Sequence, residues 1–157
     1  MTAAPAATLA VMAPLTGGAT SLAAVPDPVF AERMVGAGMA VEPPETGESR
    51  VVSPIDGTVL TLHPHAFVVL SASGTGILVH LGIDTVHLQG EGFVLHTHKG
   101  AVVAAGDPMV TFDPAAVRAH GLSAICPVVV LDSAPDSVAD PEPGRTVTAG
   151  DPLFRWG

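Results

Sequence analysis

Apolar residues in this chain of 157 residues occur in short runs that are bounded by turn-forming residues. The sequence contains 17 Gly and 15 Pro, which is enough to interrupt the chain every few residues. Runs rich in Val, Ile and Leu of this length are typical of buried β-strands and not of long helices. The clearest of them lie at residues 58–62, 66–70, 77–79 and 127–131. We therefore predict an all-β protein.

Two pairs of segments repeat the same pattern. Residues 12–17 (MAPLTG) resemble residues 52–57 (VSPIDG), and residues 103–112 (VAAGDPMVTF) resemble residues 147–156 (VTAGDPLFRW) almost class for class. In the second pair a Gly-Asp-Pro turn leads into an alternating strand that ends in an aromatic residue. Two copies are too few for a solenoid. The pattern predicts an internally duplicated antiparallel β-sandwich or barrel-sandwich.

Helical signals are weak and local. Asp113 and Pro114 form an N-cap and a first-turn proline before residues 115–120, and Gly121 follows them, which predicts one short helix. A short helical or irregular turn is expected within residues 26–38. Residues 138–146 are expected to form a loop. One or two short helices are thus predicted beside the strands.

The length fits one domain, which we place at residues 11–157. Residues 1–10 are a low-complexity segment rich in Ala, Thr and Pro, and we expect a disordered tail there. No basic region precedes this segment, and no apolar run approaches about 20 residues, so neither a secretory signal nor membrane insertion is predicted. The only cysteine, Cys126, excludes an intramolecular disulfide and is expected to be a small core residue. Cytoplasmic localisation follows as the expectation.

The formal net charge of −9 narrows the class of partner. Neither nucleic acid nor an anionic membrane surface attracts an acidic protein, so both are disfavoured as partners. A basic protein partner is compatible with this charge.

The stretch 77–93 (ILVHLGIDTVHLQGEGF) contains the strongest candidate for chemistry. Its apolar run leads to His80, and Gly82 and Asp84 follow on one short turn. This position suits a neutral imidazole that acts as a nucleophile or a metal ligand. The turn after His80 could supply a backbone carbonyl that fixes the tautomer of the ring. From the local pattern alone, however, a structural histidine is the favoured interpretation.

The spacing of the other histidines allows a metal hypothesis. His63 and His65 would place both rings on one face of a strand, and together with His80 and Asp84 they provide four ligands of the zinc type. The remaining histidines are expected to be solvated surface residues. They are His87, His96, His98 and His120.

Several motifs taken together resemble one family. The resemblance is to the glucose-type enzyme IIA component of the bacterial phosphoenolpyruvate:sugar phosphotransferase system, and it runs from about residue 11 to the end of the chain. The residues of 26–38 (PDPVFAERMVGAG) take part in it. The other motifs are Ser53-Pro-Ile-Asp-Gly57, His65-Ala-Phe67, Val79-His-Leu-Gly-Ile-Asp-Thr-Val86, Gly90-Glu-Gly-Phe93 and Pro127-Val-Val129.

The resemblance implies a cytoplasmic phosphocarrier with a β-sandwich fold and no required cofactor. His80 matches the phosphorylated residue of the family, and His65 matches its second active-site histidine. The implied phosphoryl donor is the histidine phosphocarrier protein, and the implied acceptor is a cysteine of an enzyme IIB domain. The resemblance leaves both glucose and N-acetylglucosamine open as the sugar, and it leaves regulated transporters and kinases open as further partners.

The resemblance also implies a docking surface around the site. Asp27 and Asp84 match acidic residues beside the family's active site. Five apolar residues match its docking rim, namely Val29, Phe30, Val35, Leu78 and Val86. We expect Phe30 and Val86 to be exposed near His80.

One residue departs from the family pattern. A threonine often precedes the second histidine by two residues in the family, and here His63 takes that place. His63 is therefore the candidate for tuning His65.

Two hypotheses from other protein classes compete with the phosphocarrier. A zinc hydrolase of the lysostaphin type would use His63, His65, His80 and Asp84, but its ligand motifs follow the opposite order along the chain. A lipoyl- or biotinyl-carrier module would need a lysine at a hairpin tip, and the only lysine, Lys99, lacks the flanking Met or acidic residues. Zinc at His65 and His80 would not decide between these classes, because two histidines beside an acidic residue collect metal incidentally.

Overall fold

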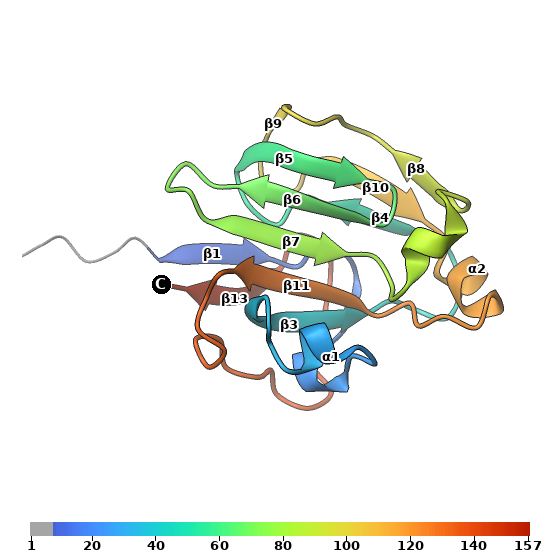
Figure 1. Cartoon of the computed structure of the whole chain (residues 1–157), viewed down its shortest axis with the longest axis horizontal. Helices are drawn as coiled ribbons and strands as arrows, with labels where there is room; N and C mark the ends of the chain where they lie inside the picture. The colour runs from blue at the N-terminus through green and yellow to red at the C-terminus, as the bar shows by residue number, and fades with distance from the viewer. Residues whose placement is uncertain (1–7) are drawn as a thin grey trace, which may run out of the picture.

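The computed structural model describes residues 8–157, and within this range all strand pairs are antiparallel (Figure 1). The largest sheet has eight strands. Their order across the sheet is β12 (Thr146–Val147), β2 (Gly17–Ser21), β3 (Gly36–Glu42), β11 (Cys126–Leu131), β7 (Gly76–His80), β6 (Ala66–Leu70), β5 (Gly57–His63) and β9 (Val102–Val103).

Two smaller sheets and four short helical elements complete the described residues. One sheet has the order β4 (Ser49–Val52), β10 (Pro108–Phe112), β8 (Phe93–Leu95), and the other pairs β1 (Leu9–Met12) with β13 (Pro152–Trp156). The helices are α1 (Pro28–Ala31) and α2 (Pro114–Ala119), and the 3-10 turns are η1 (Leu22–Ala24) and η2 (Thr85–Leu88).

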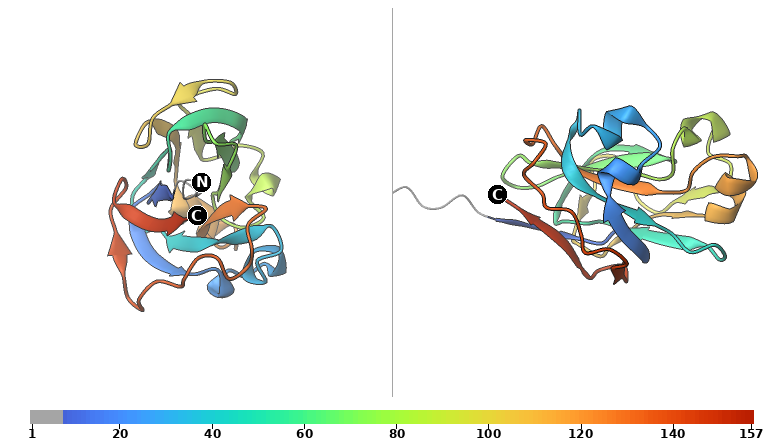
Figure 2. Two further views of the ribbon diagram at one scale, coloured as in Figure 1. Left: turned by 90° about the vertical axis from the view of Figure 1, so that its left-hand side faces the viewer. Right: turned by 90° about the horizontal axis from the view of Figure 1, so that it is seen from below.

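The sheets curl around one main hydrophobic core, as the end-on view in Figure 2 shows. Fully buried residues from different sheets fill the core. Among them are Phe67 and Ile77 from the eight-stranded sheet and Phe112 from the three-stranded sheet. Burial of apolar area at about 25 cal/mol per Å² is the main term that holds such a sandwich together. The predicted all-β sandwich with one or two short helices is confirmed.

Equivalent hydrogen bonds confirm the internal duplication. The amide of Met12 donates to Pro54 O at 2.9 Å, and in the other repeat the amide of Val52 donates to Pro14 O at 2.7 Å. The two Gly-Asp-Pro turns are also alike. In each, a carboxylate oxygen accepts from the amide three residues earlier at 2.9 Å, Asp107 from Ala104 and Asp151 from Thr148.

Local signals placed the helices correctly. Asp113 caps α2 by accepting from the Ala115 amide at 3.0 Å, and Pro114 occupies the first turn. Within residues 26–38 the chain forms α1 and then enters β3 at Gly36. Cys126 is fully buried, and burial raises the pKa of its thiol to about 12, so it is a core residue as predicted.

The start of the ordered chain differs from the expectation. Residues 9 and 10 were assigned to a tail, but they belong to β1, where Leu9 pairs with Trp156 and Ala10 with Arg155. β13 supplies backbone hydrogen-bond partners to the residues before Val11, and this is why β1 begins at Leu9. Thr8 is exposed and precedes β1, and residues 1–7 of the predicted tail lie outside the described residues. Within residues 8–157 no helix is long and apolar enough to cross a membrane.

Candidate functional site

Three neighbouring strands bring three histidines together, because β5 and β7 end, and β6 begins, at the same end of the sheet. His80 is the last residue of β7 and pairs with Ala66 at the start of β6, while His63 is the last residue of β5. His65 lies in the tight turn between β5 and β6. The amide of Leu81 donates to His65 O at 2.7 Å, which ties this turn to the chain after His80. In Figure 1 this end of the strands lies on the side of the molecule opposite the C-terminus.

The rings lie next to one another in a row. The centroids of His63 and His65 are 5.7 Å apart with the planes at 27°, so these rings are stacked. His65 stands edge-on to His80 at 5.4 Å, with the planes at 69°. The ring of Phe30 lies 5.3 Å from His80 and covers another side of it.

The backbone selects one tautomer of His80. The Nδ1 atom lies 2.5 Å from the carbonyl oxygen of Gly82. Because a carbonyl only accepts, Nδ1 carries the proton and donates it, and Nε2 keeps its lone pair. The expectation of a backbone carbonyl in the turn is confirmed, and Gly82, with φ of +76°, supplies it.

Burial keeps His80 neutral. Removal from water lowers the pKa of His80 below its ordinary value, and this outweighs the opposing effects of the hydrogen bond to Gly82 and of the Asp27 and Asp84 carboxylates. The pKa of His65 is also lowered, first by burial and then by the neighbouring His80 and His63 rings. At neutral pH both rings are therefore uncharged, and Nε2 of His80 is nucleophilic.

These shifts predict how stability depends on pH. In the unfolded chain both histidines return to pKa values near 6.5, so that state binds more protons than the folded state just below this pH. The free energy of unfolding should therefore fall as pH drops through the window between the unfolded and the folded pKa values. Urea unfolding from about pH 5 to 8 measures it. His80→Gln and His65→Gln should each reduce this slope, because each removes one histidine whose pKa is lowered in the folded state. A wild-type slope in both variants would contradict the prediction.

The two predicted acidic residues lie on separate elements beside His80. Asp27 caps α1 and accepts from the Val29 amide at 2.8 Å, which holds its carboxylate at the start of that helix. Asp84 is exposed, and its backbone is left-handed with φ of 61°. Both act on the pKa of His80, so the structure brings them to the same site.

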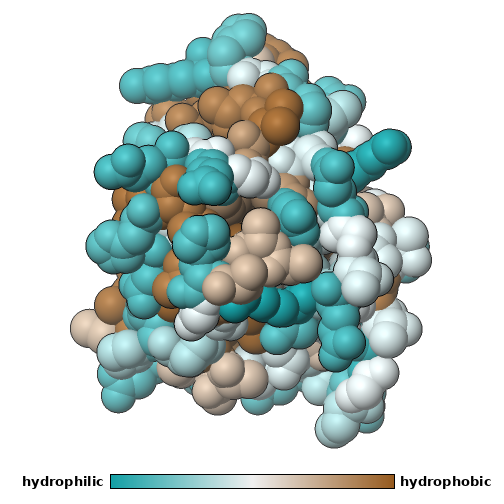
Figure 3. All heavy atoms as spheres, turned by 90° about the vertical axis from the view of Figure 1, so that its right-hand side faces the viewer, coloured by the Kyte–Doolittle hydropathy of each residue, from teal (hydrophilic) through white to brown (hydrophobic). Residues whose placement is uncertain are grey.

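The apolar rim is only partly exposed. Val29 and Val86 are 40% and 53% exposed, and Val35 and Leu78 are half-buried. Phe30 was expected to be exposed, but it is only 8% exposed, and this expectation was wrong. α1 turns its one large aromatic side chain inward, onto a small core that includes Ala40, Ile83 and Val129. Figure 3 shows the end of the molecule where β7 finishes, with apolar areas set among polar side chains.

The zinc ligand set is not assembled. Within residues 8–157 no group of three or more His, Cys, Asp or Glu side chains is placed to hold a metal ion. His63 and His65 stack face to face, and His65 stands edge-on to His80. The hydrolase hypothesis, which needs His63, His65, His80 and Asp84 as joint ligands, therefore has no support.

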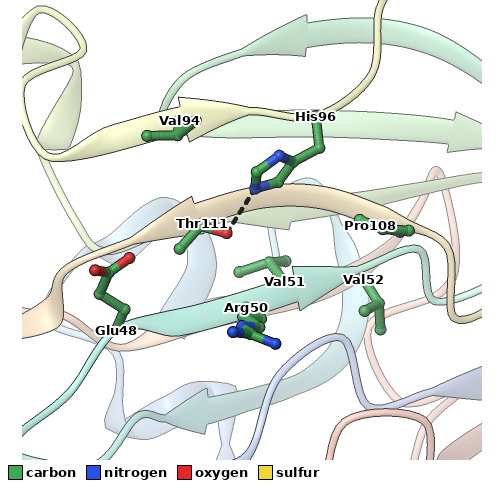
Figure 4. Close-up of a pocket in the computed structure, with 8 residues that line it drawn as sticks. All are labelled: Glu48, Arg50, Val51, Val52, Val94, His96, Pro108 and Thr111. Atoms are coloured by element: carbon green, nitrogen blue, oxygen red, sulfur yellow. Dashed lines mark hydrogen bonds between the residues drawn. The ribbon is translucent and has the colours of Figure 1, made fainter.

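The other four histidines are exposed, as predicted. His96 lines a hollow of about 550 Å³ on the outer face of the β4–β10–β8 sheet, where its Nε2 lies 2.6 Å from Thr111 Oγ1 (Figure 4). Val52, Val94 and Arg50 line the same hollow, and His63, His65 and His80 do not. His96 is thus a suitable control position for variants of the site.

Comparison with known proteins decides the family. The model of the phosphoenolpyruvate-dependent sugar phosphotransferase system, EIIA 1 family, matches residues 9–135. The chain belongs to this family. EIIA proteins are phosphotransferase components that carry phosphoryl groups on a histidine for sugar transport, and the predicted phosphocarrier function is confirmed.

Relatives with known names support this assignment. The glucose-specific EIIA component of Bacillus anthracis is 40% identical over 142 residues, which cover 89% of this chain and 84% of that protein. The glucosamine-specific EIICBA component of Bacillus subtilis is 42% identical over 127 residues, which cover 80% of this chain but 20% of that longer protein. The solved glucose permease IIA of Mycoplasma capricolum superposes with a TM-score of 0.84 at 32% identity, covering 98% of this chain and 99% of that one.

Proposed function

We propose that His80 is the residue of this EIIA chain that carries the phosphoryl group, and that Nε2 is the atom that binds it. The contact between Nδ1 and Gly82 O carries this proposal, because it leaves Nε2 as the only ring nitrogen with a free lone pair. The lowered pKa of His80 keeps that lone pair unprotonated at neutral pH. The neighbouring Phe30 ring excludes water from one side of the labile product.

The transfer needs no cofactor. The lone pair of Nε2 attacks the phosphorus of the donor phosphohistidine, and the donor N–P bond breaks in line with its electron pair returning to the donor nitrogen. The proton on Nδ1 stays on the bond to Gly82. The protein mainly positions the groups and stabilises charge on the transferring oxygens.

His65 is proposed to supply that stabilisation. Its ring stands edge-on to His80, an orientation in which a ring N–H can point to a phosphoryl oxygen on Nε2. His63 stacks on His65 and is the proposed tuning residue, since its ring lowers the pKa of His65.

We propose the histidine phosphocarrier protein as donor and a cysteine of an enzyme IIB domain as acceptor, on the cytoplasmic side of a sugar permease. The relatives include glucose-, glucosamine- and mannose-specific systems, so a hexose or an amino-hexose is the proposed sugar class. Asp27 and Asp84 suit a basic partner, and the exposed Val29 and Val86 provide apolar docking area. β1 begins and β13 ends at the side of the molecule away from the histidines (Figure 1).

The experiment that tests this function is labelling of the whole chain from phosphoenolpyruvate with the two general phosphotransferase proteins. We expect an acid-labile, base-stable label. ¹⁵N-³¹P coupling should place phosphorus on Nε2 of His80. A label on Nδ1, or on another residue, would contradict the proposal.

Docking is tested by Val86→Asp. Val86 is 53% exposed, so a charge there should weaken the apolar contact with both partners and raise the KM for the phosphorylated donor. The thermal midpoint should hardly change, because exposed substitutions usually shift stability by within about 0.5 kcal/mol. Val102→Asp is the matched control, since Val102 is 84% exposed on β9, away from the three histidines. Equal KM values for both variants would rule out a docking role for Val86.

A further inference from the structure

We propose that Thr85 is a positioning residue that keeps the chain after β7 in the shape that sets the tautomer of His80. This inference rests on the proposed role of His80 as phosphoryl acceptor. Thr85 is the first residue of η2, and it is only 1% exposed. A hydroxyl buried to this degree costs free energy unless it has a partner, so its contacts indicate what it stabilises.

The hydroxyl of Thr85 holds the peptide that follows His80. Thr85 Oγ1 donates to Leu81 O at 2.7 Å. The amide of Leu81 in turn donates to His65 O at 2.7 Å. Leu81 is therefore held on both of its backbone groups, on one side by the turn that carries His65 and on the other by Thr85. The carbonyl that Thr85 holds belongs to the peptide unit that leads directly into Gly82.

The methyl group of Thr85 lies against Gly82 itself. A Cβ added to Gly82 would come within 2.7 Å of Thr85 Cγ2 and 2.9 Å of Ser123 O, so this residue is enclosed from two directions. The next amide, that of Ile83, donates to Ser123 O at 2.9 Å. Thr85 thus holds the peptide unit before Gly82, and Ser123 holds the peptide unit after it. The direction of the Gly82 carbonyl follows from these two restraints.

The direction of the Gly82 carbonyl decides which nitrogen of His80 is nucleophilic. While Gly82 O faces Nδ1, the proton stays there and Nε2 remains free. If the chain around Gly82 relaxes, the hydrogen bond weakens and the tautomer with Nε2–H becomes populated. In that tautomer Nε2 has no free lone pair and cannot accept a phosphoryl group. Thr85 acts through Gly82 and not on the reacting atoms.

Two substitutions separate the hydroxyl from the methyl group. Thr85→Val keeps the branched shape but removes the donor and leaves the Leu81 carbonyl unpaired. Thr85→Ser keeps the donor and removes the methyl group. We would record the ¹⁵N shifts of the His80 ring, and the kcat and KM for phosphoryl transfer from the phosphorylated donor protein, in the full chain.

Thr85→Val should lower kcat by about 5- to 10-fold, the effect of one hydrogen bond, with KM unchanged because the docking rim is intact. The ¹⁵N shifts of His80 should move toward the averaged values of mixed tautomers. Thr85→Ser should restore the Nδ1–H tautomer and a kcat within about 2-fold of wild type.

A Thr85→Val protein that is destabilised but keeps the wild-type tautomer and kcat would overturn the proposal and leave Thr85 a structural residue only. If Thr85→Val does not fold, Thr85→Ala decides, because a folded Thr85→Ala protein lacks both the hydroxyl and the methyl group, and a wild-type tautomer and kcat in it would also overturn the proposal. The proposed function is tested separately by whether His80 carries the label at all, which no Thr85 variant changes.

Discussion

Replacing His80 by glutamine should abolish labelling from phosphoenolpyruvate. No other imidazole in residues 8–157 combines a ring nitrogen held by a carbonyl at 2.5 Å with burial that keeps it neutral. The amide of glutamine keeps the size and a hydrogen-bond donor but is not a nucleophile, and losing the nucleophile removes the pathway. The measurement is the stoichiometry of the label after excess donor has been added.

His96→Gln is the matched control for this experiment. His96 also has a ring nitrogen in a hydrogen bond, with Thr111, but it lies on the outer face of the three-stranded sheet. It should be labelled to the same extent as wild type. Circular dichroism of both variants must show the native fold, because His80 ends a core strand. Wild-type stoichiometry in His80→Gln, with loss in another single histidine variant, would move the acceptor elsewhere.

Replacing His65 by alanine should slow phosphoryl transfer by about 10²- to 10³-fold, the usual cost of losing one donor that stabilises transferring charge. His65→Gln retains an N–H group, so its loss should be smaller. Both variants should still accept phosphate on His80, because Nε2 and its Gly82 partner are unchanged. The single-turnover rate of phosphoryl exit to the cysteine of the enzyme IIB domain distinguishes these cases.

His63 provides the internal comparison for His65. It has the same side chain and stacks on His65, but the ring that stands edge-on to His80 is that of His65. His63→Ala should therefore have a smaller effect on the exit rate than His65→Ala. Equal exit rates in wild type, His65→Gln and His65→Ala would show that His65 is a bystander, and His63 would then be the residue to test for charge stabilisation.

Much of this protein could be predicted from local sequence. The strands could be predicted because each short apolar run must bury its side chains. The helix α2 could be predicted because Asp113 caps it with its own side chain and Pro114 occupies its first turn. The repeated Gly-Asp-Pro turns predicted the duplication, since both carboxylates hold their turns within four residues. The motif around His80 was specific enough to indicate the phosphocarrier family, and it included Gly82, whose carbonyl proved to be the tautomer partner.

Other features were decided only by contacts between distant segments. Leu9 is ordered because it pairs with Trp156 at the other end of the chain. Phe30 is buried because β3 and β11 offer it a small core, which no pattern near residue 30 indicates. His63, His65 and His80 form a row because antiparallel pairing of β5, β6 and β7 aligns their ends. The importance of Thr85 depends on the Leu81 and Gly82 peptides that surround it in the fold. Local sequence determined the strands, the turns and the candidate histidine, while packing decided which side chains face water and which backbone carbonyl faces the His80 ring.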